Sequence, residues 1–497
     1  MGKKANNKPQ RPKARAPKGF RDLSPATVQS RRQILNVISE TYELYGFEPL
    51  ETPSIEYVDA LGKFLPDVDR PEGGVFGFED DDGQWLALRY DLTAPLARFV
   101  AEGRDALARP YRRYQWGTVF RNEKVGPGRF REFMQCDADT VGTASMAAEA
   151  ELIAMQATAL EAIGLPQDDF VIRLNNRKIL DGILETINVS TVEDDATRLT
   201  VLRAIDKMDR LGAGAVRELL GKGREDKSGD YTDGANLSPD QIDQVMAFVE
   251  AGAGNLATLK DLVAGSETGL AGINEIEEIL SLLAIQNVNQ NCAQFDPAVI
   301  RGLAYYTGPV FETELTFETL DEKGKPRRFG SVGSGGRYDG LVRRFTGQDV
   351  PATGISIGID RLMAAVEARK LLQGNWQAPV VVTVMDRDNL SDYQAMVTEL
   401  RNAGIKAELY LGTSGMKAQL KYADKRGAPI AVIQGSDERD RGEVMLKDLI
   451  LGGLIAQNVD DNKAWREDQP AQVAASRADL VSAVREMLAR DHSEHHA

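Results

Sequence analysis

Residues 111–141 have the sequence YRRYQWGTVFRNEKVGPGRFREFMQCDADTV, and their pattern indicates two strands joined by a loop. The predicted strands cover 111–120 and 131–141, and the connection between them contains two glycines and a proline. Gly and Pro are common in such connections because they suit the backbone of turns. The stretch therefore predicts a long β-hairpin, and with it antiparallel sheet.

The segments around this hairpin mix helices with further strands. Apolar residues at three-to-four spacing predict a helix from Ser24 to Gly46, with Ser24 and Pro25 at its start. Residues 47–55 are typical of a strand, and their two prolines favour an edge or interface position. The other elements predicted up to residue 175 are strands at 84–90 and 171–175 and helices at 91–102 and 147–163.

The middle of the chain changes character. Residues 193–292 consist of helices between Gly-rich and polar breaks, which predicts an inserted helical module with a polar loop at 223–236. The elements predicted after it are a hairpin of strands 310–316 and 328–332, a Gly-rich patch at 330–336, a helix from Tyr338, a strand at 353–359 and a helix from near Asp360. Antiparallel sheet interrupted by helices predicts an α+β fold.

Residues 378–450 alternate strands with helices, which predicts a small α/β domain with a mainly parallel sheet. Its predicted elements are strands at 378–385, 406–411 and 429–435 and helices at 390–404 and 416–427. A last helix is expected at 476–490, after a polar stretch.

Length and composition limit the possible classes of protein. The chain has 497 residues, which suggests about three domains at ~150 residues each. Its longest apolar run, 380–385, is too short to cross a bilayer. The N-terminal residues contain no apolar segment, so a secretory signal is not expected. Only two cysteines, Cys136 and Cys292, are present, so a reducing, cytoplasmic location is expected.

Histidine is missing from the whole body of the chain. The three histidines, His492, His495 and His496, all lie among the last six residues. Nucleophile systems that need a histidine base, and zinc sites with histidine ligands, are therefore excluded from the folded domains. Chemistry there must use carboxylates, arginine, lysine, tyrosine, polar side chains and backbone dipoles.

Positive charge is concentrated at the N-terminus. Residues 1–17 are basic and polar with almost no apolar content, which is typical of a disordered arm. The net charge of −15 includes this arm, so the rest of the chain is more acidic still and is unsuited to coating nucleic acid in general. A solubilising tail and an electrostatic arm for RNA both remain open as interpretations.

Three arginines stand at turns or strand ends, where guanidinium groups could bind phosphate. Arg121 ends the first strand of the hairpin, and Phe133 on the second strand could stack on an adenine. Arg301 lies on a Gly-bounded turn with two tyrosines, and Arg361 stands at a strand-to-helix junction that also suits an anion. Each has a plain structural alternative: a solvated hairpin, half-buried tyrosines and a helix-surface arginine.

Further polar side chains could line a pocket for a small cationic or amide-bearing ligand. Asp91 and Thr93 follow a predicted strand, and Gln135 and Asp139 share one side of an extended segment. Acid–base chemistry by paired carboxylates is the competing hypothesis. The two tyrosines of the Arg301 turn, which would complete the pocket, are Tyr305 and Tyr306.

The order and spacing of these motifs resemble the class II aminoacyl-tRNA synthetases, and specifically the histidyl-tRNA synthetase family. FRNE at 120–123 with RFREF at 129–133 looks like the second motif of the class, and GISIGIDRL at 354–362 looks like the third. Pro53 stands where the first motif has its dimer-interface proline. RGLAYYTG at 301–308 and GGRYDGL at 335–341 resemble histidyl-specific elements, and the resemblance covers roughly residues 18–450.

The resemblance implies a division of the chain into domains. A class II antiparallel-sheet catalytic domain would occupy 18–192 and 293–372, interrupted by the helical insertion at 193–292. A small α/β anticodon-binding domain with a C-terminal helix would occupy 378–490, and the basic arm at 1–17 would precede the others.

The resemblance also implies a role for each candidate residue. For ATP, it implies that Arg121 binds the nucleotide, that Glu123 and Phe133 contact the adenine, that Arg361 binds the γ-phosphate and that Arg301 binds the α-phosphate. For histidine, it implies that Asp91 and Thr93 hold the α-amino group while Asp139 and tyrosines hold the imidazole. The implied histidine pocket is Asp91, Thr93, Gln135, Asp139, Tyr305, Tyr306 and Tyr338.

The implied reaction forms histidyl-adenylate and pyrophosphate from L-histidine and ATP, and then transfers histidine to the 3′ end of tRNA(His). Fixed cations and Mg²⁺ would stabilise charge on the phosphoryl oxygens, and no side-chain nucleophile would be needed. The expected ligands are thus ATP with Mg²⁺, L-histidine and tRNA(His). A homodimer is expected. Neither a membrane partner nor a metal site formed by protein residues alone is expected.

Two positions depart from the family pattern. Ala304 stands where the family usually has Asp, and because its neighbours match we expect a neutral change. Gly126 stands where bacterial members usually carry a Gln that helps to recognise the extra 5′ guanylate of tRNA(His). The sequence therefore predicts an enzyme that does not depend on that guanylate.

A non-catalytic histidine sensor, similar to the regulatory subunit of ATP phosphoribosyltransferase, is the alternative function. Such a subunit has no use for a tRNA-binding domain, whereas residues 378–450 resemble one and the phosphate-binding arginines are present. A purely RNA-binding or scaffold role is disfavoured by the acidic body and the complete pocket.

Overall fold

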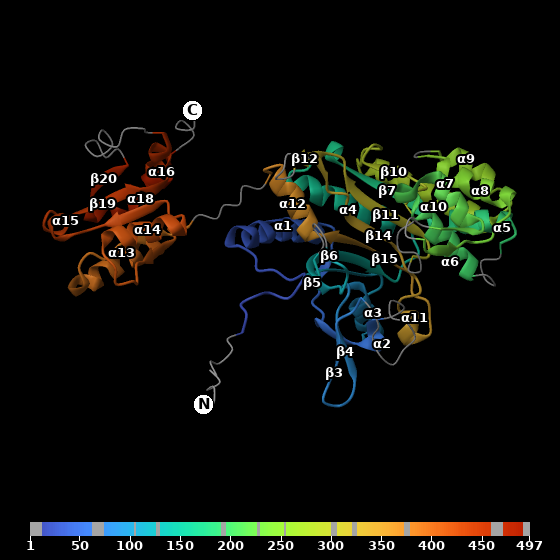
Figure 1. Ribbon diagram of the computed structural model, residues 1–497, viewed down its shortest axis with the longest axis horizontal. Coiled ribbons are helices and arrows are strands. Elements are labelled where there is room, and N and C mark those ends of the chain that lie inside the picture. Colours follow the sequence, from blue (N-terminus) through green and yellow to red (C-terminus); the bar gives the residue numbers. More distant parts are fainter. Residues whose placement is uncertain are drawn as a thin grey trace, which may run out of the picture. The chain divides into compact units, whose positions relative to one another are not determined.

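The computed structural model describes residues 12–61, 74–103, 106–125, 130–189, 195–225, 229–252, 255–299, 306–320, 326–371, 378–458 and 471–490. Several predicted features lie outside these ranges: most of the basic arm, the loop at 126–129, and Arg301, Ala304 and Tyr305 of the predicted turn. The chain divides into two compact units, Met1–Gly374 and Asn375–Ala497, which are described separately (Figure 1).

The first unit is built on a sheet with the strand order β1-β5-β6-β15-β14-β11-β7-β10 (Figure 1). The inner neighbours pair antiparallel, whereas β1 with β5 and β10 with β7 pair parallel at the two edges. This sheet confirms the predicted α+β class. Its strands are β1 (Glu48–Pro49), β5 (Tyr111–Phe120), β6 (Glu132–Val141), β7 (Phe170–Asn176), β10 (Ala293–Phe295), β11 (Pro309–Leu315), β14 (Ser331–Arg337) and β15 (Ala352–Gly358).

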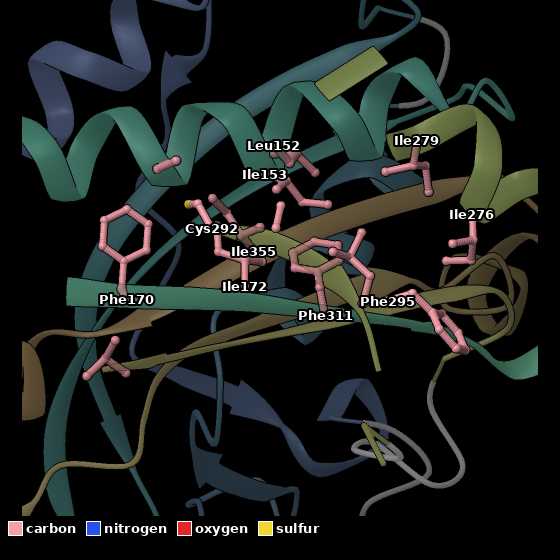
Figure 2. Close-up of a cluster of buried hydrophobic side chains, with 14 of the residues drawn as sticks. Leu152, Ile153, Phe170, Ile172, Ile276, Ile279, Cys292, Phe295, Phe311 and Ile355 are labelled. Carbon is pink, nitrogen blue, oxygen red and sulfur yellow. The ribbon is translucent and has the colours of Figure 1, made fainter. Parts of the chain in front are cut away.

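Helix α4 (Ala147–Ile163) lies over this sheet and forms the centre of the core. It is apolar on almost every side, which is typical of a helix that is buried all round. Figure 2 shows Leu152 and Ile153 of α4 beside Ile172, Phe311 and Ile355 from three strands of the sheet. Helices that pack against α4 are α1 (Pro25–Leu44) and α10 (Glu267–Ile285).

Elements with strong local signals have the predicted positions. Helix α1 begins at Pro25, and the Ser24 hydroxyl accepts a hydrogen bond from the Thr27 N–H at 3.2 Å. The strand predicted over 47–55 is wrong for most of its length, because only β1 and then β2 (Ile55–Tyr57) form there. Pro49 and Pro53 have no N–H to donate to a ladder.

The strand predicted at 328–332 is also corrected, because β14 runs from Ser331 to Arg337 and contains most of the Gly-rich patch at 330–336. A Cβ on Gly335 would collide with the Phe311 ring and the Gly354 carbonyl, so glycine is needed for close packing here rather than for a turn. The helix predicted from Tyr338 is wrong as well. Tyr338 is buried, and the short helix α11 (Arg343–Thr346) begins five residues later.

The inserted segment is mainly helical, as predicted. The loop predicted at 223–236 is in part a ladder, because β8 (Gly223–Glu225) pairs antiparallel with β9 (Tyr231–Asp233). Its hairpin is compact since Gly223 has a φ of +117° and a Cβ there would collide with Thr232. The helices of the inserted segment are α6 (Asp195–Ile205), α7 (Met208–Leu220), α8 (Pro239–Glu250), α9 (Leu256–Leu262) and α10, and α5 (Arg177–Thr186) precedes it.

Smaller elements flank the main sheet. A three-stranded sheet has the order β2-β4-β3, and β12 pairs with β13 in a separate ladder. These elements are β3 (Gly77–Glu79), β4 (Trp85–Leu88), β12 (Glu318–Leu320), β13 (Pro326–Arg328), α2 (Val58–Leu61), α3 (Thr93–Glu102), α12 (Ile359–Ala368) and the 3-10 turn η1 (Gln167–Asp169).

The second unit is a sheet with the order β17-β16-β18-β19-β20. Its first three strands are parallel, which confirms the predicted α/β pattern, whereas β19 and β20 add antiparallel. The helix predicted at 476–490 is shorter because β20 and a 3-10 turn take its first residues. The elements are β16 (Val380–Val382), α13 (Leu390–Asn402), β17 (Ala407–Leu409), α14 (Met416–Arg426), β18 (Ile430–Ile433), α15 (Ser436–Asp440), β19 (Glu443–Asp448), α16 (Leu449–Asn458), β20 (Gln472–Ser476) and α18 (Leu480–Leu488).

Candidate functional site

A pocket of about 330 Å³ lies in the first unit, beside β6, β14, β15 and the start of α12. Polar groups and two aromatic side chains line it, as expected for a site that binds both a flat base and charged groups. Of the residues predicted from sequence, it is lined by Arg121, Glu123, Phe133, Gln135 and Arg361.

Arg121 is held between two aromatic rings at the end of β5. Its guanidinium carbon lies 4.4 Å from the centre of the Tyr90 ring and 5.1 Å from the centre of the Phe133 ring. Its Nε donates to the Tyr90 carbonyl at 3.2 Å, and the Tyr90 hydroxyl donates to Glu123 at 3.3 Å. Cation–π contacts and the hydrogen bond fix the arginine at the pocket wall.

The junction of β15 and α12 forms another part of the pocket. Arg361, in the first turn of α12, donates to the Ser331 carbonyl. The carboxylate of Asp360 accepts the Met134 N–H at 2.7 Å, which ties the start of α12 to β6. A helix N-terminus next to an arginine is a favourable environment for an anionic ligand.

A row of polar side chains leads away from this pocket along β6. Gln135, Asp137 and Asp139 are two residues apart and therefore share one face of the sheet. The Gln135 side-chain amide donates to the Ser356 hydroxyl at 2.6 Å, and Ser356 is the register partner of Asp137 on β15. Gln135 therefore belongs both to the pocket and to the row.

Asp139 stands at the far end of the row. Its carboxylate is 2.7 Å from the guanidinium of Arg113, whose side chain is completely buried, and it accepts a hydrogen bond from the Tyr338 hydroxyl. Gly354 on β15 faces it, and a Cβ at that position would collide with the carboxylate. The structure thus brings together Asp139 and Tyr338, two residues that the sequence places in one pocket.

Asp91, Thr93 and Tyr306 lie in the same electrostatic neighbourhood. Thr93 is the first residue of α3, and Asp91 binds to the first turn of this helix because its Oδ1 accepts the Ala94 N–H at 3.0 Å. Burial raises the pKa of Asp91, and burial together with the nearby carboxylates of Asp137 and Asp139 raises the pKa of Tyr306. These groups therefore share a poorly solvated region with Asp139.

Sequence reasoning missed several residues of this region. Burial, followed by the charge of Asp139, raises the pKa of Asp137 to about 7. Two-residue alternation along β6 could have identified Asp137, and the same alternation on β5 could have identified Arg113. Arg21 also reaches the site, where it pairs with Asp360, but no sequence signal connects positions 339 residues apart.

Comparison with known proteins identifies the fold family. A family model described as histidyl-tRNA synthetase matches residues 19–362, and an anticodon-binding domain model matches residues 378–487. The chain belongs to the histidyl-tRNA synthetase family. A histidine–tRNA ligase of Cereibacter sphaeroides is 58% identical over 96% of this chain and 98% of its own length, and one of Jannaschia sp. is 57% identical over 97% and 98%.

Solved structures agree with this assignment. Histidyl-tRNA synthetase from Nostoc sp. is 29% identical with a TM-score of 0.70, and the match covers 96% of this chain and all of that one. A Bacillus halodurans structure described as an ATP phosphoribosyltransferase regulatory subunit/histidyl-tRNA synthetase has a TM-score of 0.65 at 24% identity, which shows the shared fold alone. The prediction of a histidine–tRNA ligase is confirmed, and the histidine-sensor alternative has less support.

Histidyl-tRNA synthetases depend on ATP, and the pocket can be compared with that requirement. Glu123 and Asp360 are its carboxylates, and no cluster of three or more potential metal ligands occurs among the described residues. Mg²⁺ is commonly held by one or two carboxylates together with substrate phosphates, so these residues fit an ion that arrives with ATP. In the part of the chain that the structure describes, no helix has the length and hydropathy to cross a membrane.

Proposed function

We propose that this chain activates L-histidine with ATP to histidyl-adenylate and then transfers histidine to the 3′ end of tRNA(His). One observation carries the proposal: Gln135 and Ser356 join the pocket that contains Arg121 and Phe133 to the buried pair of Asp139 and Tyr338. A nucleotide in the pocket and an amino acid over the row would have their reacting ends side by side.

The ATP roles follow from the lining of the pocket. Phe133 offers a ring on which the adenine stacks, and Glu123 lies where a carboxylate can accept from the base. Arg121 and Arg361 bind the phosphates, with Arg361 at the γ-phosphate, and Arg301 binds the α-phosphate. A pocket carboxylate would hold a Mg²⁺ ion that arrives with ATP, and the ion would supply further positive charge to the phosphates.

The histidine roles follow from the buried acids. Asp91 and Thr93 hold the α-amino group at the start of α3, and Asp139 holds the imidazole. The tyrosines that complete this pocket, with Gln135 at its edge, are Tyr305, Tyr306 and Tyr338. Because these polar groups are poorly solvated, an amino acid without imidazole nitrogens would leave them unpaired and would be rejected.

The chemistry needs no side-chain nucleophile. A carboxylate oxygen of histidine attacks the α-phosphorus, the new P–O bond forms as the bond to the β-phosphate bridge breaks, and pyrophosphate leaves. A terminal ribose hydroxyl of the tRNA then attacks the carbonyl carbon, loses its proton, and displaces AMP. The arginines stabilise the charge that accumulates on the phosphoryl oxygens during the first step.

The remaining proposals concern assembly and the two parts of the chain. Residues 18–192 and 293–372 form the catalytic domain around the insertion 193–292, and 378–490 contact the anticodon region of tRNA(His). We also propose a cytoplasmic location and a homodimer. The homodimer is supported by exposed Ile55, Tyr57 and Trp116, which lie on strands near Pro53.

ATP–pyrophosphate exchange with each amino acid supplied singly tests the proposal. We expect exchange with histidine only, and its loss in Arg301→Ala. If no amino acid supports exchange while histidine still binds, the sensor function replaces the ligase.

A further inference from the structure

The short segment before α1 lies beside the proposed ATP pocket, and its Arg21 contacts two residues that line it. The Gly19 carbonyl accepts the Arg131 N–H at 2.9 Å, and the Phe20 ring packs edge-on against Phe76 at 5.8 Å. Gly19 has a φ of +89°, and a Cβ there would lie 2.7 Å from the Arg131 side chain. Glycine is therefore required for this close approach.

Arg21 makes the two decisive contacts of the segment. Its guanidinium carbon lies 3.7 Å from the centre of the Phe130 ring, and its Nη2 donates to Asp360 at 2.6 Å. Phe130 and Asp360 both line the pocket, but they come from the loop before β6 and from the start of α12. One side chain thus holds two walls of the pocket together.

Asp360 would be unfavourable in this position without a cationic partner. Its side chain is 15% exposed, and it lies in the wall of a pocket expected to receive a triphosphate. Like charges within several ångströms of each other repel strongly where water is partly excluded. The ion pair with Arg21 compensates this charge, and the Met134 N–H satisfies the other carboxylate oxygen.

Building on the proposed function, we propose that Arg21 is a positioning residue for ATP, which neutralises Asp360 and holds Phe130 against the start of α12. If Arg21 had a purely structural role, it would make the same contacts, but its loss would not specifically change the affinity for ATP. The two roles therefore differ in what happens to the KM for ATP when the arginine is removed.

The first test compares Arg21→Ala and Arg21→Lys in histidine-dependent ATP–pyrophosphate exchange. We expect Arg21→Ala to raise the KM for ATP about tenfold, since an uncompensated charge then faces the phosphates. We expect kcat and the KM for histidine to change by less than about twofold. Arg21→Lys should retain most of the affinity for ATP because lysine keeps the positive charge, although it lacks the planar guanidinium group.

Arg217→Ala is the matched control. Arg217 also forms an exposed ion pair, with Asp243 at 2.5 Å, but in the inserted helical segment away from the pocket lining. Its loss should leave the KM for ATP unchanged.

The second test combines Arg21→Ala with Asp360→Asn. If charge compensation is the role of Arg21, removal of the acid should recover at least about threefold of the lost affinity. A lowered melting temperature with an unchanged KM for ATP in Arg21→Ala, or no recovery in the double variant, would overturn the inference. Direct titration of wild type and Arg21→Ala with ATP keeps this test independent of catalysis. Absence of exchange would then contradict the proposed function alone, whereas equal ATP affinities would contradict the role of Arg21.

Discussion

Replacement of Asp137 by asparagine should make the stability of the first unit less dependent on pH. Asp137 is 2% exposed, and its Oδ1 has no hydrogen-bond partner among the described residues. Burial, followed by the charge of Asp139, raises the pKa of this carboxyl to about 7, although Arg113 and a hydrogen bond from Ser356 oppose the rise. Asparagine has nearly the same shape but does not titrate.

The sign follows from the two pKa values. The carboxyl ionises near pH 4 in the unfolded chain but at about 7 in the folded chain. Its contribution to stability is therefore complete below about pH 4 and is lost as the pH rises to about 7, because the folded chain retains a proton that the unfolded chain releases. Each pH unit in this window changes the free energy of unfolding by about 1.4 kcal/mol, so the wild type should lose ~2 kcal/mol relative to Asp137→Asn between about pH 5.5 and about pH 8.

Urea unfolding of both proteins at these two pH values measures this difference. Groups that titrate identically in both proteins cancel in the comparison, and a fixed protein concentration removes the effect of association. Asp261→Asn, at an exposed position, is the control and should show no such pH dependence. If the stability difference between wild type and Asp137→Asn is the same at both pH values, the buried-carboxyl argument is refuted.

Three further predictions concern the substrates. Gly354→Ala should raise the KM for histidine about tenfold or more, because the new Cβ displaces Asp139 from Tyr338. The KM for ATP should be nearly unchanged, and equal effects on the KM values of both substrates would argue against this reason. Phe133→Leu should raise the KM for ATP about tenfold by removing the stacking face, and direct ATP titration that shows no loss would contradict the stacking role. Aminoacylation of tRNA(His) should proceed equally with and without the extra 5′ guanylate, since Gly126 has no side-chain amide, and a strong loss without the guanylate would disprove this.

Local patterns were sufficient for the elements that carry the pocket. The limits of β5 and α4 follow from alternation and from helical spacing, since both signals come from neighbouring residues. The place of the patch glycines inside β14 was not predictable from neighbouring residues, because Gly335 must clear Phe311 and Gly354 on adjacent strands. Propensity alone assigns such a glycine to a turn.

The same division applies to the site. Motif order identified Arg121, Phe133 and Arg361, which all line the pocket. The partners that give these residues their environment were not predictable, because an ion pair such as Arg113 with Asp139 depends on strand register rather than on composition. Sequence therefore predicted the residues that would contact substrate better than those that hold them in place.

The charge balance of the histidine side of the site suggests how it selects its ligand. Burial raises the pKa of all three acids there, Asp91, Asp137 and Asp139. Arg113 opposes this rise in each case, and at Asp91 the charge of Arg121 opposes it more strongly. An excess of buried acid destabilises the folded chain when the site is empty, and a ligand with an ammonium group relieves that cost. An analogue of histidine without the α-amino group should therefore lose more affinity than one hydrogen bond accounts for, because it leaves the acids uncompensated. Binding of histidine should also lower the pKa of Asp137, so the pH dependence described above should diminish when histidine is present.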